Sequence, residues 1–264
     1  MEIREKIQAS GTPFLRRMDR RIRLLEPEQR AFAALELKSE SFPKGTDLVR
    51  PHEEHGLPFI LKGGYVLVSR TSALGHRMNI DILIPGDIGN VQAIILLRAD
   101  STYTALNDVV ISPIPLEVYR DLMQTHPQSS AALLWTGAVS RSLMAERLYS
   151  VGRRNGYQRI GHFLLELLTR LEEVGLTDGG SFRAPLTLAV LGDLLGLTPE
   201  HVSRIVSRLR RDGFITTKRD IWTVIDRPGL EKVCDFDPSY LHAADREVEN
   251  ADAHEVRRPS ASPR

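Results

Sequence analysis

The pattern of apolar and polar positions between Phe42 and about Leu116 predicts a β-rich region. Short apolar runs alternate there with turn signals such as Gly63-Gly64 and Pro85-Gly86-Asp87. Short strands separated by closely spaced turns are typical of an antiparallel barrel or sandwich. The expected strands include Tyr65–Ser69, Ile80–Ile84 and Val109–Ile114.

After Pro127 the apolar positions recur at helical spacing, which predicts a long helix followed by a second one. The apolar positions of the first helix are Ala132, Trp135, Val139 and Leu143, with a slip of one residue before Met144, Leu148 and Val151. Such a helix can face a partner chain or pack in the core of its own subunit. The polar segment 152–156 predicts a hinge. The apolar stripe of the second helix runs from Ile160 to Leu171, and Gly175 closes it. Residues 177–183, which include Asp178-Gly179-Gly180, are expected to form a turn.

Both ends of the chain differ in composition from the middle. Residues 1–18 combine mixed charge with little pattern, and from Asp237 onward charges are dense and apolar residues sparse. Segments of this kind bury too little apolar surface to offset the entropy of ordering, so both are expected to be loosely ordered. Arg21 to Leu37 has the pattern of a helix interrupted by Pro27.

The stretch Leu186–Ile225 has the pattern of a helix-turn-helix. Thr187 can cap a first short helix, and Gly196 permits a tight turn where a Cβ would crowd the backbone. Thr198 can cap a second helix, and Pro199 suits its first position because the missing N–H costs nothing there. The second helix has the apolar stripe Val202, Ile205, Val206 and Leu209, and its other face carries Glu200, His201, Ser203, Arg204, Ser207, Arg208 and Arg211.

A basic hairpin is expected to follow this second helix, which Gly213 ends. Phe214–Thr217 and Ile221–Ile225 are strand-like runs around Lys218-Arg219-Asp220, the arrangement of the wing in a winged helix. Between Ser181 and Asp220 seven Lys or Arg residues stand against four Asp or Glu. An Arg-bearing polar face is what a phosphate backbone requires. The alternative is a helical hairpin with a solvated charged face.

Composition limits the classes of protein to consider. The chain has 264 residues, 42% hydrophobic and 26% charged, and a formal net charge of +1. It is therefore expected to be globular, with one or two domains. The single cysteine, Cys234, excludes a disulfide framework and a Cys-ligated iron–sulfur cluster. No signal peptide and no run near the ~20 apolar residues of a membrane helix are found, so a cytoplasmic location is expected. No cofactor is indicated, and no spacing supports a catalytic triad, so no enzymatic activity is expected.

These regions together resemble the Crp/Fnr superfamily of bacterial transcription regulators. The DNA-reading motif of that family is similar to Gly196–Arg204, followed by Leu209 and Asp212–Ile215. The segments that resemble turns and strands of the family's cyclic-nucleotide-binding-type β-roll are Phe42–Gly45, Leu57–Gly63 and Pro85–Asp87. The resemblance covers about residues 20–235.

The resemblance implies an α+β fold with an antiparallel β-roll of the double-stranded jelly-roll type, a long central dimerisation helix and a C-terminal winged helix. It implies a homodimer on an inverted repeat in double-stranded DNA, with recognition helices ~34 Å apart, and RNA polymerase as a further partner. The implied divisions are a flexible N-terminus (1–20), a sensor domain (21–125), a dimerisation helix and hinge (126–155), a DNA-binding domain (156–235) and a disordered tail (236–264).

The Fnr-like branch of the family further implies that Glu200, Ser203 and Arg204 read bases in a half-site resembling TTGA. Their spacing of i, i+3 and i+4 places them on one helix face. Arg can fork onto guanine O6 and N7, Glu can accept from a cytosine amino group, and Ser can serve either role. The auxiliary or backbone contacts are expected from Thr187, Thr198, His201, Arg208, Lys218 and Arg219.

Three departures from the family pattern qualify what the resemblance implies. Leu188-Ala189-Val190 stands where relatives usually carry polar residues. The sensor turn continues as Ile88-Gly89-Asn90-Val91, and Arg98 is misplaced for binding a cyclic phosphate, so cyclic AMP is not expected and the effector is unknown. The cysteines of the cluster-binding type are missing.

Two other functions remain open at this point. One is a small-molecule-binding regulator with a degenerate DNA reader, which Leu188-Ala189-Val190 favours. The other is a cupin-like metal protein built around His52 and His55, although a solvated loop is the preferred interpretation of that segment. Cys234 is either an oxidation sensor or an inert thiol. His162 has no expected partner.

Overall fold

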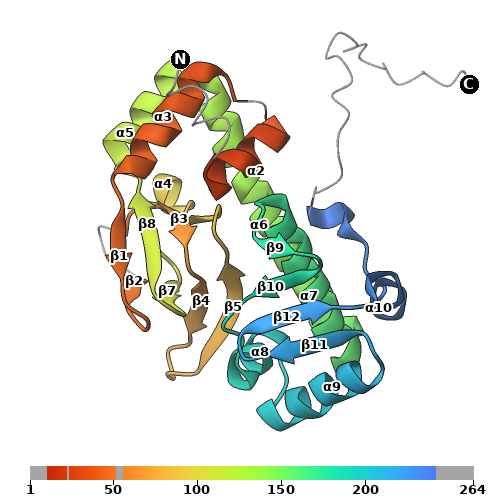
Figure 1. The fold of residues 1–264 in the computed structure, drawn as a ribbon. Coiled ribbons are helices and arrows are strands. Elements are labelled where there is room, and N and C mark those ends of the chain that lie inside the picture. The colour runs from red at the N-terminus through yellow and green to blue at the C-terminus, as the bar shows by residue number, and fades with distance from the viewer. Residues whose placement is uncertain (1–10, 23, 52–55, 242–264) are drawn as a thin grey trace, which may run out of the picture.

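The computed structural model describes most of the chain, namely residues 11–22, 24–51 and 56–241. A β-rich N-terminal lobe and a C-terminal lobe meet along helices α6 (Pro127–Arg153) and α7 (Gly156–Glu173) (Figure 1). Helix α9 (Pro199–Arg211) lies at the opposite end of the molecule from α3 (Glu26–Leu37). The architecture is the expected α+β fold.

The N-terminal lobe is a sandwich of two antiparallel four-stranded sheets, ordered β1-β8-β3-β6 and β2-β7-β4-β5. Inward residues of both sheets, including Phe59, Leu61, Val66 and Tyr103, form one core. This confirms the expected antiparallel sandwich. Its strands are β1 (Glu40–Phe42), β2 (Asp47–Val49), β3 (Phe59–Gly63), β4 (Val66–Thr71), β5 (Arg77–Leu83), β6 (Ile88–Gly89), β7 (Thr102–Ala105) and β8 (Val109–Pro113), with the short helix α4 (Ala93–Leu96) between β6 and β7.

Helix α2 (Pro13–Ile22) corrects the expectation of a flexible N-terminus for residues 13–20, whereas residues 1–10 lie outside the described residues. Phe14 is fully buried in a core shared with α3 and the sandwich. The segment looks polar in the sequence because of its arginines, but Arg17 is only 6% exposed and pairs with Asp87. The sequence alone cannot distinguish an arginine that is paired inside the protein from one that is exposed to solvent, so it does not reveal this helix.

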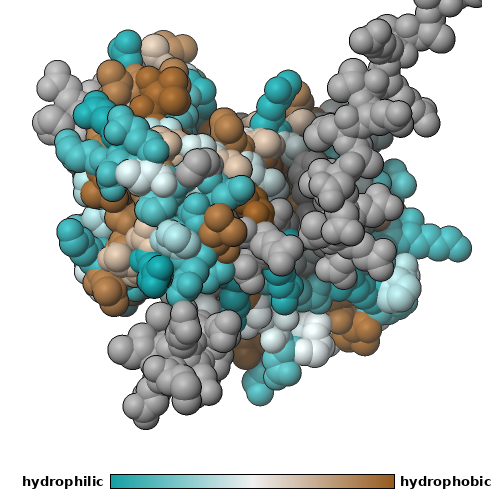
Figure 2. Space-filling model, turned by 90° about the horizontal axis from the view of Figure 1, so that it is seen from above, coloured by the Kyte–Doolittle hydropathy of each residue, from teal (hydrophilic) through white to brown (hydrophobic). Residues whose placement is uncertain are grey.

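Helix α3 is the helix expected within Arg21–Leu37, but it begins at Glu26. Pro27 lies in its first turn and does not interrupt it. Helix α5 (Leu116–Thr125) contributes Leu122 to the same core cluster as Phe32 and Leu35 of α3. Seen from above, hydrophobic and hydrophilic residues are interspersed on the end of the molecule that carries α3 and α5 (Figure 2).

Helix α6 has two apolar faces, which explains the slip in its sequence pattern. One face packs within its own lobe through the buried Ala132, Leu133 and Leu143 and the partly buried Trp135. The other face is turned away from the lobe, and its exposed apolar residues are Leu134, Met144, Leu148 and Tyr149. The prediction that this helix packs in the core of its own subunit is therefore confirmed for the first face only.

The C-terminal lobe is a winged helix whose sheet is larger than the sequence indicated. Strands β11 (Ile215–Lys218) and β12 (Ile221–Val224) form the expected hairpin. Strand β10 (Ser181–Arg183) pairs with both β12 and β9 (Thr177–Asp178). The segment expected as a turn is therefore a second hairpin, with Gly179 and Gly180 at positive φ between its strands.

The expected start of a disordered tail at residue 236 is also corrected. Helix α10 (Arg227–Cys234) leads into a 3-10 turn, η1 (Pro238–Leu241). Leu241 is buried, and the Tyr240 hydroxyl donates to Glu166 Oε2 at 3.1 Å. The rest of the expected tail, residues 242–264, lies outside the described residues.

The two lobes share one hydrophobic core. Tyr65, Ile82 and other residues of the sandwich pack with residues of α7 and the winged helix in a single cluster. The Tyr65 hydroxyl donates to the Arg183 carbonyl oxygen. The Asn79 backbone N–H of β5 donates to Asp193 Oδ2 at 3.0 Å. Asp193 lies on α8 (Leu188–Leu195), the first helix of the helix-turn-helix formed by α8 and α9, which is called the reader below. The sandwich therefore directly positions that helix.

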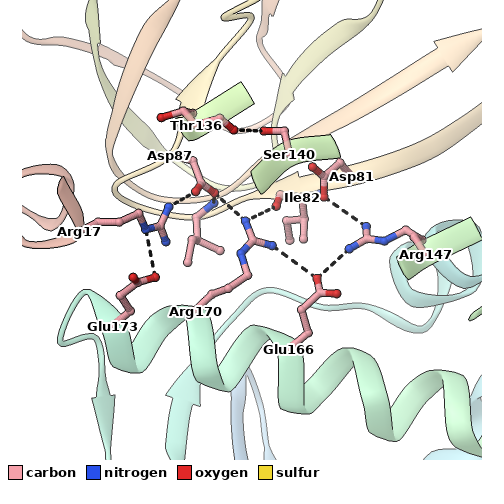
Figure 3. Close-up of polar contacts among 11 residues, drawn as sticks. Arg17, Asp81, Ile82, Asp87, Thr136, Ser140, Arg147, Glu166, Arg170 and Glu173 are labelled. Carbon is pink, nitrogen blue, oxygen red and sulfur yellow. Dashed lines mark hydrogen bonds and ion pairs between the residues drawn. The ribbon is translucent and has the colours of Figure 1, made fainter. Parts of the chain in front are cut away.

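A chain of buried charges runs through the same junction (Figure 3). Asp87 contacts Arg17 and accepts from Arg170 Nη2 at 2.7 Å, while Glu166 Oε1 lies 2.8 Å from Arg147 Nη2 and 3.6 Å from Arg170 Nη1. Burial acts to raise the pKa of Asp87, but the guanidinium groups of Arg17 and Arg170 hold it below its usual value. Asp87 is therefore ionised at neutral pH.

Candidate nucleic-acid interface

The two reader helices begin and end where the sequence predicts. The Thr187 hydroxyl oxygen accepts from the Val190 N–H at 3.2 Å and caps α8, and Thr198 accepts from the His201 N–H at 3.3 Å and caps α9. Gly196 joins the helices at a φ of 65°. Both predicted caps and the predicted turn are thus confirmed.

The helix-turn-helix requires a glycine at position 192, and the sequence pattern does not reveal this requirement. A Cβ on this residue would lie 2.5 Å from the carbonyl oxygen of Leu197 in the following turn. Real Cβ atoms do not approach backbone so closely. The missing side chain therefore lets α8 approach the turn that orients α9.

Helix α9 has one buried and one exposed face. Its buried residues are Val202, Ile205, Val206 and Leu209, as predicted. Glu200 and Arg204 are exposed and Ser203 is half-buried on the other side. These three residues, called the reading face below, line one surface hollow together with Pro199 and Leu188. The structure therefore brings the predicted base-reading trio together and adds Leu188 from α8.

The Glu200 carboxylate is held in its ionised form. A hydrogen bond from its own backbone N–H and one from the Thr198 hydroxyl lower its pKa, and Arg204 acts in the same direction. An ionised carboxylate can only accept hydrogen bonds. Glu200 can consequently meet a donor such as an amino group.

Two of the predicted auxiliary residues have contacts within the protein. The Arg208 guanidinium lies over the Tyr157 ring, 4.8 Å from its centroid, and its Nε is 3.5 Å from Asp212 Oδ2. His201 is half-buried, and its ring lies near Gly156 at the start of α7. Both are therefore less free to meet a ligand than Arg204.

The wing places two cations at its tip. Lys218 pairs with Ile221 in the ladder, so Arg219 and Asp220 form the turn, with Arg219 at a φ of 57°. Lys218 and Arg219 are exposed, and neither forms a salt bridge within the described part of the chain. Asp220 is instead engaged by Arg183 Nη1 at 2.9 Å. Arg183 lies on β10, within the segment that the sequence pattern predicts as a turn, so its pairing with the wing is not expected from the sequence.

The interior of the sandwich is filled where a sensor ligand would be sought. The rings of Phe59 and Tyr103 meet edge-on at 5.9 Å, and a Cβ on Gly89 would collide with the Phe59 ring. The Asn90 side chain donates to the Gly56 carbonyl oxygen at 2.7 Å. Arg98 is exposed, outside this core.

The remaining candidates from the sequence have limited support. His52 and His55 lie outside the described residues, and no group of three or more potential metal ligands occurs among the residues that are described. Cys234 is fully buried, and burial raises its pKa to about 12, as expected for an inert thiol. Across the described ranges, no helix is long and apolar enough to cross a membrane.

His162 is not isolated, contrary to expectation. Its Nε2 lies 3.1 Å from Glu146 Oε1, and its ring contacts those of Phe236 and Tyr240. Burial, followed by the charge of Arg154, lowers its pKa to about 4. These partners come from α6 and the C-terminal segment, so sequence spacing could not reveal them.

Comparison with known proteins identifies relatives of both lobes. Residues 158–233 match the family model of the Crp-like helix-turn-helix domain. The chain is 24% identical over 172 residues to the anaerobic regulatory protein of Haemophilus influenzae, covering 65% of this chain and 66% of that protein. It is 32% identical over 152 residues to the transcriptional regulatory protein btr of Bordetella pertussis, covering 57% and 62%. The matches thus span just under two thirds of these curated relatives.

The fold is also similar to that of a solved protein structure. The solved structure of FixK2 from Bradyrhizobium japonicum superposes with a TM-score of 0.63 at 21% identity, covering 74% of this chain and 95% of that one. The family model covers residues 158–233, which include α8 and α9. Residues 158–233 therefore form a Crp-like helix-turn-helix domain, and the chain is similar in sequence to transcription regulators and in fold to FixK2.

Proposed function

We propose that this protein is a homodimeric transcription regulator that reads an inverted repeat with TTGA-like half-sites. The observation that carries the proposal is the exposed reading face at the start of α9, where Glu200, Ser203 and Arg204 line one hollow. In a helix-turn-helix, the N-terminal residues of the second helix contact base edges in the major groove.

The chemistry of the reading face fits a G·C pair inside the half-site. Arg204 can donate two hydrogen bonds to guanine O6 and N7, and ionised Glu200 can accept one from a cytosine amino group. Ser203 can donate or accept. Phosphate contacts are assigned to Lys218 and Arg219 on the wing and to the arginines at the end of α9.

The exposed face of α6 supports a homodimer. Leu134, Ala138, Arg141, Ala145, Leu148 and Gly152 are spaced alternately by four and three residues, the repeat of a coiled-coil seam. All six residues are exposed to solvent in the single chain, and Leu134 and Leu148 are each 75% exposed. A second copy packed along this seam would bury both leucines and would present two copies of α9 to one face of DNA.

Selection from random duplexes by the purified full-length protein, without added ligand, tests the proposal. Enrichment of an inverted repeat with TTGA-like arms is expected. Binding that depends on salt but not on sequence would contradict base reading. The choice of ligand-free protein follows from the packed sandwich core, in which the Phe59 and Tyr103 rings are in contact.

The second candidate function is regulation by a small molecule with a degenerate reader. The exposed apolar residues Leu188 and Ala189 at the start of α8 favour it, because they cannot bind phosphate through their side chains. Failure to enrich any sequence, together with thermal stabilisation by a metabolite, would support this candidate. Contact with RNA polymerase and a cytoplasmic location stay predictions from the family.

A further inference from the structure

Leu188 is an apolar residue placed outside the core of the reader. It is the first residue of α8 and is 41% exposed, whereas Leu191, Leu194 and Leu195 of the same helix are at most 3% exposed. Part of the Leu188 side chain therefore lies outside the packing of α8. A leucine at this place leaves apolar surface in water unless a ligand covers it.

The position of Leu188 is beside the reading face. With Pro199 it supplies the apolar part of the hollow whose polar part is formed by Glu200, Ser203 and Arg204. A hollow that combines both kinds of wall suits a ligand whose edge carries polar groups next to an apolar one.

The major groove offers one apolar group of this kind, the C5-methyl of thymine. The groove edges of adjacent base pairs place such a methyl next to guanine acceptors or cytosine donors. We propose that Leu188, together with Pro199, contacts a thymine methyl in the half-site and thereby determines sequence specificity at that base pair. This inference rests on the proposed function, and it gives the apolar departure at the start of α8 a role in reading in place of a lost phosphate contact.

The test replaces each thymine of one half-site in the selected duplex, one at a time, by deoxyuridine. This change removes only the methyl group and keeps every hydrogen-bonding atom. Removing a methyl that is buried on Leu188 should weaken binding about fourfold, the usual value for one buried carbon group. At least one thymine is expected to show this sensitivity with the wild-type protein.

The same duplexes are then titrated with Leu188→Ala, Leu188→Met and Leu74→Ala. Leu188→Ala should weaken binding of the parent duplex about fourfold or more and should lose the sensitivity at that one thymine. Leu188→Met keeps an apolar side chain of similar volume and should retain the sensitivity. Leu74 is a matched control because it is 84% exposed in the turn between β4 and β5 and does not line the hollow at the start of α9.

The possible results distinguish failure of the Leu188 assignment from failure of the proposed sequence-specific DNA binding. Sequence-specific binding in which Leu188→Ala keeps the wild-type sensitivity at every thymine would overturn the Leu188 assignment alone. A uniform loss on all duplexes would do the same, since it would place Leu188 on the sugar–phosphate backbone. If wild-type protein selects no sequence, the proposed function fails, and the inference fails with it. Thermal unfolding of the variants checks that each remains folded.

Discussion

At the scale of single residues, the cations of the reader fall into two groups. Arg204 and Lys218 are exposed, and neither forms a salt bridge to another described residue. Arg208 already lies over Tyr157 and beside Asp212, so part of its charge is neutralised in the free protein. We therefore expect base reading from Arg204, phosphate contact from Lys218, and a smaller electrostatic contribution from Arg208.

Arg204→Ala should cost about 1–3 kcal/mol of binding free energy on the preferred duplex and should relax discrimination at one base pair. The physical reason is the loss of two hydrogen bonds to one guanine. Competition titrations against duplexes changed at each position measure both effects. An equal loss on every sequence would show that Arg204 contacts the backbone and not a base.

Lys218→Ala should weaken binding to all duplexes alike and reduce the slope of log affinity against log salt by about one. Each phosphate neutralised by a cation releases counterions, and Lys218 is free to neutralise one. Arg208→Ala is the matched comparison and should change the slope less, because Asp212 already occupies its guanidinium. A base-specific effect of Lys218→Ala would contradict the assignment of the wing.

Residues with local partners could be predicted from the sequence, and residues with distant partners could not. Thr187 and Thr198 bond to backbone N–H groups three residues away, so the motif itself identifies them as caps. The partner of Arg183 is 37 residues distant and that of Arg17 is 70 residues distant. Only the fold brings those pairs together.

At the scale of elements, contacts between neighbouring helices and strands determine which faces are buried, and the periodicity of apolar residues alone does not predict these contacts. The slip in α6 arises because one helix serves two surfaces, and a single-face pattern cannot describe it. The sequence pattern does not reveal helix α2 and the turn η1, because few apolar residues hold them, Phe14 and Leu241 among them, and because Arg17 of α2 pairs inside the protein. Helices α8 and α9 were predicted well because their caps, turn and stripe are all local signals.

Gly192→Ala should destabilise the protein by about 1–3 kcal/mol, because the added Cβ would meet the Leu197 carbonyl oxygen and force α8 away from the turn. Gly137→Ala in α6 is a matched control, since a Cβ there has no neighbour within 4 Å. It should stabilise by about 0.5–1 kcal/mol through the lower entropy of the unfolded chain. Urea unfolding at one protein concentration compares them. Equal effects of the two substitutions would contradict the close approach at Gly192.

Leu148→Glu should convert the proposed dimer into monomers and abolish cooperative binding to the inverted repeat. Leu148 is 75% exposed and is the fifth of the six seam residues on α6, and the substitution would bury two like charges against each other. Sedimentation measures the molecular mass. Leu74→Glu changes a leucine outside the seam that is 84% exposed, and should leave the mass unchanged. A wild-type protein that sediments as a monomer would contradict the dimer directly.

At the scale of the whole molecule, the lobes are joined by a common core and a chain of buried charges. The cluster that includes Tyr65 and Ile82 continues into the winged helix without a break. Arg170 of α7 reaches Asp87 of the sandwich, and its Nη2 also donates to the Ile82 carbonyl oxygen at 3.3 Å. The orientation of the reader is therefore coupled to the folding of the sandwich, and we expect the lobes to unfold together.

Arg170→Met should destabilise the protein by about 3–5 kcal/mol near neutral pH, because it leaves the Asp87 and Glu166 carboxylates buried with less compensating charge. In the wild-type protein the pKa of Asp87 is lowered, so its stabilising contribution is present above the unfolded value and is lost as pH falls through the lowered pKa. In the variant that pKa rises, so protonation on acidification relieves the penalty. The difference in unfolding free energy between wild type and variant should therefore shrink as pH falls from neutral toward 4.

The control is Arg183→Met, which breaks a pair whose arginine side chain is 68% exposed and should cost less than about 1 kcal/mol at every pH. Urea unfolding followed by circular dichroism and by tryptophan fluorescence measures both variants, since Trp135 and Trp222 lie in different lobes. Coincident transitions from the two probes in wild type are expected for lobes that unfold as one unit. If Arg170→Met costs no more than Arg183→Met, or if the two probes already separate in wild type, the junction does not couple the lobes, and the orientation of the reader must be set by the dimer or by an effector.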